Sequence, residues 1–167
     1  DDRILLRDTG GGIKKARPFL DGNEPFLVHN ADILSDINLA ELYRHHRESN
    51  AEATLLVSQR QTSRYLLLDD ANRLHGLINK STGETKPEGF SFQERQYKEM
   101  AFGGIHVISP SLFRYMESRQ WEGKFSIIPF YLSVCETACI QGYPLQDRRW
   151  FDIGKPETLA KAEEYYR

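Results

Sequence analysis

The sequence predicts a doubly wound α/β domain with a mixed sheet, and three observations lead to this fold class. A continuous apolar run at 25–32 ends in polar residues, which is typical of a parallel strand covered on both faces. An amphipathic stretch at 37–49 and a second apolar run at 51–59 continue an alternation of strand, helix and strand. Two apolar stretches within 64–79 surround the turn residues 70–73, which indicates a hairpin inserted into that alternation.

The segments before the first of these runs are expected to form a strand, a glycine break and a short helix. Residues 3–7 read as a short buried strand, and the glycines at 10–12 would end it. A helix over 13–20 should stop near Arg17, because Pro18 removes a hydrogen-bond donor and restricts the residue before it.

Capping and turn residues predict the remaining elements. Asp36 or Asn38 can cap the helix at 37–49. The polar segment 80–99 is expected to be a long exposed loop. The last expected elements are a strand at 100–109, a helix starting at Ser109–Pro110, a helix over 125–138, a strand at 139–145 and a closing helix opened by Gly154 and Pro156.

Composition and charge exclude several classes of protein. A chain of 167 residues suggests one domain with a sizeable core, and its net charge of −2 gives no field that favours nucleic acid. No apolar run approaches the ~18 residues of a membrane span, and there is no signal-peptide pattern. Cys135 and Cys139 are expected to be a reduced pair on one helix face, which favours a cytoplasmic protein. The chain opens at Asp1 without an initiator Met, so we expect the native protein to extend upstream.

The three glycines at 10–12 form the first candidate binding element. A strand followed by glycines and a helix start is one way in which a backbone approaches a nucleotide, because a residue without Cβ lets a base or phosphate lie against the main chain. The run matches neither G-x-G-x-x-G nor G-x-x-x-x-G-K-[ST], so it predicts neither a dinucleotide fingerprint nor a Walker A loop. A flexible turn is the alternative interpretation.

Two aspartates at strand ends form the second candidate element. Asp32 follows the apolar run 25–32 where it should emerge at its carboxyl end, and Asp152 follows two aromatic residues and precedes a turn. Carboxylates suit Mg²⁺, and one ion shared by both residues would offset their mutual repulsion. The alternative for each aspartate is a local cap or turn residue. His29 is expected to be a packed histidine within the strand.

Gly103 and Gly104 form the third candidate element, because they interrupt the strand at 100–109. Glycines weaken a strand unless something must approach the backbone closely. A β-bulge is one explanation, and a sugar ring lying against the strand is the other.

Taken together, these segments resemble the sugar-1-phosphate nucleotidyltransferases, most closely the small single-domain N-acetylmuramic acid 1-phosphate uridylyltransferases and mannose-1-phosphate guanylyltransferases. The match follows the family's order over nearly the whole chain. The matching segments are LLRDTGGGIKKA, PFLVHNADIL, FGGIHVISPSLF, the GY at 142–143 and WFDIGKPETLAKA. The combination of order and spacing is more specific than any single motif.

The resemblance implies a Rossmann-like nucleotide-diphospho-sugar transferase fold and an enzyme of nucleotide-sugar biosynthesis. Such an enzyme moves an NMP from an NTP, UTP or GTP here, to a sugar 1-phosphate and releases pyrophosphate, with Mg²⁺ as cofactor. The implied metal-binding and catalytic residues are Asp32 and Asp152. The implied contacts are Thr9, Gly10, Gly11 and Gly12 with the nucleotide and Gly104 with the sugar.

The sequence also departs from the family. Members begin with a G-x-G-T-R loop and a following Pro-Lys pair that hold the NTP phosphates, and residues 1–167 lack both. We therefore expect one nucleotidyltransferase domain of which this chain is the carboxyl-terminal two thirds. Ala31 replaces the usual glycine before the aspartate, and the segment around Lys80 matches the sugar-binding segment poorly.

Two other functions stay open at this point. One is a regulatory protein that binds nucleotide sugars without catalysis. The other is a metal-dependent glycosyltransferase, although the usual D-x-D at the central strand end is missing around Asp32. The base, the sugar and the oligomeric state are left open, and a homo-oligomer is allowed.

Overall fold

The structure is a computed structural model that describes residues 7–91, 96–145, 149–154 and 156–166. The predicted strand at 3–7 therefore lies almost entirely outside the described residues. The elements in chain order are α1 (Asp8–Leu20), β1 (Phe26–His29), β2 (Ile33–Ser35), α2 (Leu39–Glu48), β3 (Ala53–Ser58), β4 (Arg64–Leu68), β5 (Leu74–Asn79), β6 (Thr85–Lys86), β7 (Lys98–Ile108), the 3₁₀ helices η1 (Pro110–Glu117) and η2 (Arg119–Trp121), α3 (Ile127–Val134), β8 (Ile140–Pro144), β9 (Trp150–Asp152) and α4 (Pro156–Tyr166).

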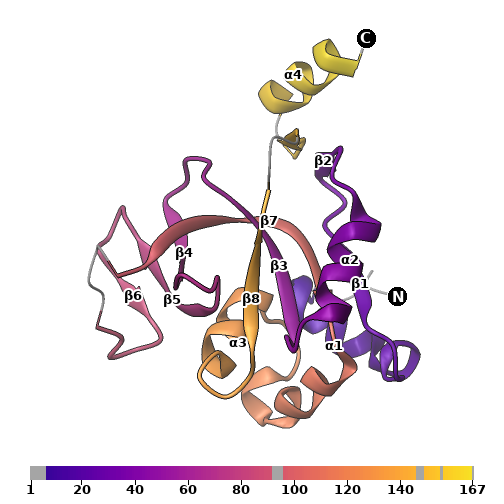
Figure 1. Ribbon diagram of the computed structural model, residues 1–167, viewed down its shortest axis with the longest axis vertical. Helices are drawn as coiled ribbons and strands as arrows, with labels where there is room; N and C mark the ends of the chain where they lie inside the picture. The colour runs from indigo at the N-terminus through magenta and orange to yellow at the C-terminus, as the bar shows by residue number, and fades with distance from the viewer. Residues whose placement is uncertain (1–6, 92–95, 146–148, 155, 167) are drawn as a thin grey trace.

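The main sheet is mixed, as predicted. Its order is β6-β5-β4-β7-β3-β8, and β1 pairs with the far end of β7 (Figure 1). β3 and β8 run parallel, whereas β1 and β3 are both antiparallel to β7. The predicted hairpin at 64–79 is confirmed as β4 and β5, and β6 adds a third strand within the segment expected to be only a loop.

The prediction for the first apolar run, which forms β1, was wrong about its strand pairing and its burial. β1 was expected to be a parallel strand covered on both faces, but it pairs antiparallel with β7 and its residues are only half-buried. His29 is exposed at its end, where Nδ1 lies 2.8 Å from the Asn30 carbonyl oxygen, so it is not a core histidine.

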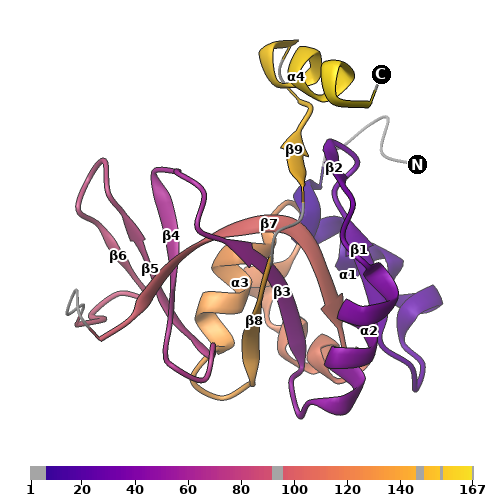
Figure 2. The ribbon, with the colours of Figure 1, turned by 45° about the horizontal axis from the view of Figure 1, so that its top comes forward.

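Apolar residues cover both faces of the main sheet, which makes the domain doubly wound. On one face the side chains of α1, η1 and α3 form the larger core with alternate residues of β3 and β4. On the other face α2 packs through Leu42 against Leu56, Ile105 and Val107. Figure 2 shows α3 and α2 on opposite sides of the strands.

A second, two-stranded sheet lies at one end of the domain. β2 and β9 pair antiparallel, and α4 follows β9 (Figure 2). This small sheet joins the segment after β1 to the carboxyl-terminal segment, so it brings together two parts of the chain that are far apart in sequence.

The first helix differs from its prediction. α1 begins at Asp8 and includes the three glycines, which were expected to form a break. It also passes through Pro18 and ends at Leu20. Arg17 makes ion pairs with Asp21 at 2.7 Å and with Glu117 at 3.2 Å, and these contacts hold the last turn in place.

The caps were predicted with mixed success. Asn38 caps α2, because its side chain accepts a hydrogen bond from the Glu41 amide at 3.1 Å. Ser109 does not cap the helix that follows it, which is a 3₁₀ helix, and its hydroxyl instead lies 2.9 Å from Nε2 of His46.

The cysteines do not share a helix face, because α3 ends at Val134 before Cys135. Both thiols are free.

Two histidines are buried in the core. His46 lies 2.8 Å from the Thr54 hydroxyl through Nδ1, and His106 lies 2.6 Å from the Tyr131 hydroxyl through Nδ1. Burial, with a smaller contribution from His45, lowers the pKa of His46 to about 4, and burial lowers the pKa of His106 to about 3. Both side chains are therefore neutral in the folded protein at neutral pH.

We expect the free energy of unfolding to fall as the pH drops from 7 to 5. The unfolded histidines take up protons near pH 6.5, whereas folded His46 and His106 stay neutral until about pH 4 and 3, so acid favours the unfolded state. Each histidine contributes up to about 1.4 kcal/mol per pH unit below 6.5. Urea titrations at several pH values measure this slope. His46→Gln should remove about half of it, and an unchanged slope in that variant would contradict the assignment.

Candidate active site

Asp32 lies in the turn between β1 and β2. The Asn30 amide donates a hydrogen bond to the Gly104 carbonyl at 2.9 Å, and the Ile33 amide donates back to the Asn30 carbonyl at 3.1 Å. These bonds hold the turn against β7 and leave the Asp32 side chain exposed. Across the described ranges no hydrogen bond reaches the Asp32 carboxylate, so it does not act as the local cap that was the alternative prediction.

Asp152 lies beside this turn because β9 pairs with β2. Asp152 is opposite Ile33 in the register, and the Ile153 amide donates a hydrogen bond to the Asp32 carbonyl at 2.8 Å. The Asp152 carboxylate also accepts a hydrogen bond from the Gly154 amide at 3.1 Å, which is the turn role that the sequence allowed. That bond occupies only part of the acceptor capacity of a carboxylate.

Both carboxylates face the same point, next to Gly154. A Cβ placed on Gly154 would lie 3.1 Å from Asp152 Oδ1 and 3.4 Å from Asp32 Oδ2. Any residue other than glycine would thus put a side chain beside both carboxylates. The structure therefore brings together the two aspartates that the sequence singled out, at a position that glycine keeps open.

This arrangement fits a magnesium ion. Mg²⁺ is usually bound through one or two carboxylates, while water and substrate phosphates supply its other ligands. Among the described residues no group of three or more His, Cys, Asp or Glu side chains could hold a metal. Asp32 and Asp152 together could supply the two carboxylates of such a site, with water and phosphate oxygens as the other ligands.

Gly104 lies in a β-bulge next to the turn that holds Asp32. The pairing of β3 with β7 shifts register between Leu55 and Val57, and Gly104 has φ +73°. A Cβ on Gly104 would lie 2.8 Å from Ile33 Cγ1 and 3.2 Å from Asn30 Nδ2. Both the backbone conformation and the close packing against the turn require glycine here. The β-bulge that the sequence allowed is therefore present.

Arg60 and Trp150 link this bulge to Asp152, and sequence reasoning missed both residues. The Trp150 indole donates a hydrogen bond to the Gly103 carbonyl at 2.7 Å, and the Arg60 guanidinium donates to the Phe102 carbonyl at 2.9 Å. The guanidinium also lies over the Trp150 ring, 4.4 Å from its centroid. Burial lowers the pKa of Arg60, while the nearby Asp152 carboxylate opposes that shift. Two signals could have found them: Trp150 precedes Asp152 by two positions, and Arg60 follows a buried strand.

The predicted nucleotide segment, Thr9 to Gly12, forms the first turns of α1. A Cβ on Gly10 would overlap the ring of Phe125, and one on Gly11 would overlap the Gly123 carbonyl oxygen. The Gly11 amide also donates a hydrogen bond to the Phe125 carbonyl at 3.1 Å. The packing of the chain itself therefore explains two of the glycines. Gly12 has no described atom from the rest of the chain within 4 Å of a Cβ placed there, so packing does not explain this glycine.

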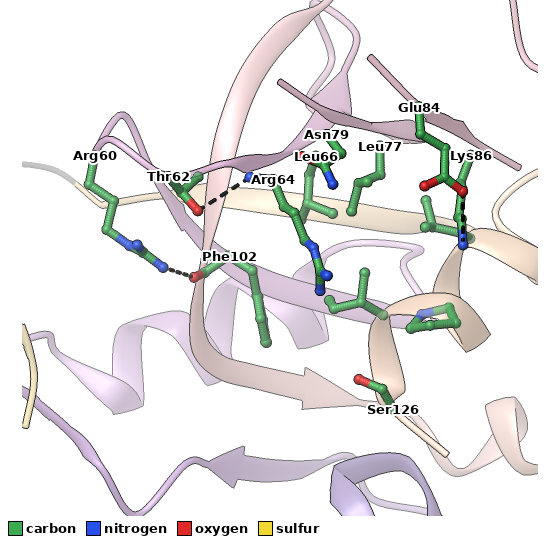
Figure 3. A pocket seen from close by; sticks show the side chains of 13 residues that line it. Arg60, Thr62, Arg64, Leu66, Leu77, Asn79, Glu84, Lys86, Phe102 and Ser126 are labelled. Carbon is green, nitrogen blue, oxygen red and sulfur yellow. Dashed lines mark hydrogen bonds and ion pairs between the residues drawn. The ribbon is translucent and has the colours of Figure 1, made fainter. Parts of the chain in front are cut away.

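A cavity of about 390 Å³ lies between β4, β5 and β7 on one side and α3 on the other. Its walls combine apolar side chains with charged and polar ones, as ligand pockets do. Figure 3 shows Arg60 at one end of the cavity and the Glu84–Lys86 ion pair at the other. Lys80, which belongs to the segment that matches the family poorly, directly follows β5 and makes an ion pair with Glu99 at 2.6 Å.

A family model described as "Nucleotidyl transferase" matches residues 4–167. The chain belongs to the nucleotidyl transferase family. It is 24% identical over 163 residues to a probable mannose-1-phosphate guanylyltransferase 3 of Arabidopsis thaliana, covering 95% of this chain and 45% of the relative. It is 26% identical over 156 residues to the mannose-1-phosphate guanylyltransferase catalytic subunit beta of Danio rerio, covering 90% of this chain and 39% of the relative. The chain thus spans less than half the length of these two relatives.

The fold of this nucleotidyl transferase chain agrees with solved structures. HddC from Yersinia pseudotuberculosis, solved in complex with GMP-PN, superposes with a TM-score of 0.70 at 17% identity, covering 99% of this chain and 65% of that one. This likeness confirms the predicted mixed α/β fold with helices on both faces. No helix in the described ranges has the length and apolar character needed to cross a membrane.

Proposed function

We propose that this nucleotidyl transferase chain carries the metal-binding and acceptor-binding part of a sugar-1-phosphate nucleotidyltransferase. The reaction moves an NMP from an NTP to a sugar 1-phosphate. An oxygen of the sugar phosphate forms a bond to the α-phosphorus, and the bond from that phosphorus to the pyrophosphate oxygen breaks. The observation that carries the proposal is the convergence of Asp32 and Asp152 beside Gly154 in a member of this family.

Asp32 and Asp152 would hold Mg²⁺, which supplies charge neutralisation on the reacting phosphates when it is bound. Gly154 keeps the space between the carboxylates free of side-chain atoms. Arg60 places a positive charge near Asp152 and is fixed by the Phe102 carbonyl and the Trp150 ring. Positioning of the two phosphates by such fixed groups accounts for most of the catalysis expected in phosphoryl transfer.

The nucleotide is proposed to lie along Thr9 to Gly12, and the sugar beside Gly104. Gly12 supports the first part, because no described packing contact explains a glycine there and the space at its Cβ position is free. Gly104 supports the second, because it lies against the turn that carries Asp32. The names of the two curated relatives favour GTP as the first nucleotide to test, and UTP follows. A cytoplasmic location and a single nucleotidyltransferase domain complete the proposal.

The proposal predicts metal-dependent pyrophosphate release by the native full-length protein. The protein is incubated with each of four NTPs and a panel of sugar 1-phosphates, and pyrophosphate is measured. EDTA should reduce the rate to background, and excess Mg²⁺ should restore it, because the carboxylate pair alone cannot neutralise the phosphates. Release that is unchanged in EDTA would contradict the metal role.

The same experiment separates the alternative functions. A regulatory protein would bind nucleotide sugars in calorimetry and release no pyrophosphate from any pair of substrates. A glycosyltransferase would consume a nucleotide sugar and release a nucleotide instead of pyrophosphate. Either result would replace the proposed function.

A further inference from the structure

The cavity beside the candidate active site carries an excess of positive charge. Its charged lining residues are Arg60, Arg64, Lys86 and Glu84. Glu84 and Lys86 form an ion pair at 3.4 Å and balance each other. The two arginines therefore determine the charge that a ligand in the cavity would meet.

One of these arginines is already held by the protein. The Arg60 guanidinium donates to the Phe102 carbonyl and lies over the Trp150 ring. The nearby Asp152 carboxylate also favours its charged form. Arg60 therefore lines the cavity and also lies near Asp152, one of the two carboxylates.

Arg64 is different, because its guanidinium has no hydrogen bond or ion pair in the part of the chain that the structure describes. Figure 3 shows its side chain reaching into the middle of the cavity, between Phe102 on one side and the Glu84–Lys86 pair on the other. The neighbouring wall is formed by the apolar side chains of Leu66 and Leu77. An arginine that extends over apolar walls without a partner is a suitable anion-binding group, since its planar fork matches the oxygens of a carboxylate or phosphate.

The position of Arg64 relates this anion to the reaction. The connection from β3 to β4 carries Arg60, which is near Asp152, and leads to Arg64, an exposed side chain that lines the cavity. A molecule with one end at the carboxylate pair can therefore extend along this connection toward Arg64. A cavity of about 390 Å³ is large enough for one sugar ring with its substituents.

Building on the proposed function, we propose that the acceptor is a sugar 1-phosphate that carries a second anionic group, and that Arg64 binds this group. Arg64 is then a specificity-determining residue for acidic acceptors. A carboxylate and a second phosphate share the required chemistry, so the test contains a compound of each kind.

The test compares three acceptors that differ only at C6: glucose 1-phosphate, glucuronic acid 1-phosphate and glucose 1,6-bisphosphate, together with the corresponding mannose compounds. Binding to the native full-length protein is measured by calorimetry, and turnover by pyrophosphate release. We expect at least one acidic compound to have a kcat/KM at least about tenfold above that of its neutral counterpart, mainly through KM, since a charge-assisted hydrogen bond contributes that much or more. The preferred compound shows whether the second anionic group of the acceptor is a carboxylate or a phosphate.

Arg64→Gln should lower kcat/KM for the preferred acidic acceptor by about 10- to 100-fold and leave the neutral acceptor nearly unchanged. Arg64→Lys should restore part of the loss, because it keeps the charge without the planar fork. Arg44→Gln, which changes an exposed arginine on α2, is the matched control and should change neither acceptor.

Two results overturn this inference and leave the proposed function intact: the neutral acceptors are used as well as the acidic ones, or Arg64→Gln affects both kinds equally. If no sugar 1-phosphate is bound or turned over, the proposed function and this inference both fail. Selective use of an acidic acceptor that depends on Arg64 supports both.

Discussion

Asp32→Asn is expected to reduce kcat by about 1,000-fold or more while the fold survives, and Asp152→Asn should do the same. Each change removes one of the two carboxylates that face the open position at Gly154. Loss of a group that stabilises charge in the transition state typically costs about 3–4 kcal/mol, and loss of the metal costs more. Asparagine has nearly the same shape as aspartate, so the turn and the β2–β9 pairing should persist.

Stability provides the second readout for these two variants. Without metal, removing one of two facing negative charges should leave the melting temperature unchanged or slightly higher. With added Mg²⁺ the unmodified protein should gain stability and the variants should not, because only the intact pair binds the ion well.

Asp70→Asn is the matched control for both measurements. Asp70 is a fully exposed aspartate in the β4–β5 turn, and it should keep both activity and metal response. Near-normal turnover by Asp32→Asn would remove this residue from the mechanism.

The adjacent glycines of α1 should respond in opposite directions to substitution by alanine. Gly11→Ala is expected to lower the free energy of unfolding by about 1–3 kcal/mol, because its Cβ would overlap the Gly123 carbonyl oxygen, which is backbone and cannot rotate away. Gly12→Ala is expected to raise it by about 0.5–1 kcal/mol, because its Cβ meets open space and alanine favours the helix.

Urea unfolding of both variants measures these differences, and each serves as the control for the other. The nucleotide proposal adds a second expectation for Gly12→Ala: the KM for the NTP should rise although the protein is more stable. If both variants lose stability equally, the packing described for Gly11 and Gly12 is incorrect. An unchanged KM in Gly12→Ala would remove that glycine from the nucleotide site.

Local patterns were sufficient for most of the elements. The helix at 37–49 was predicted from its apolar spacing and from Asn38, and α2 has that cap. The strands at 51–59 and 64–79 were predicted from continuous apolar runs and turn residues. These signals succeed because propensity, capping and periodicity act between residues close together in the chain.

Helix α1, which contains three consecutive glycines, and strand β1 show where such patterns fail. Three glycines in a row have low helix propensity, yet packing against Gly123 and Phe125 stabilises a helix through them. The apolar run of β1 suggested a parallel strand, but the antiparallel pairing with β7 depends on a segment far away in the chain. Tertiary contacts outweigh local preference in both cases.

The sequence by itself determined the class of fold, most of the helices and strands, and the two aspartates as candidate site residues. Only the tertiary structure decided that Asp32 and Asp152 face one position and that Arg60, near Asp152, lines the cavity. It also decided that the Arg64 guanidinium has no hydrogen bond or ion pair among the described residues. The reason is physical. Spacing along a chain specifies which face a side chain occupies, whereas the meeting of distant segments depends on strand pairing and packing across the whole domain.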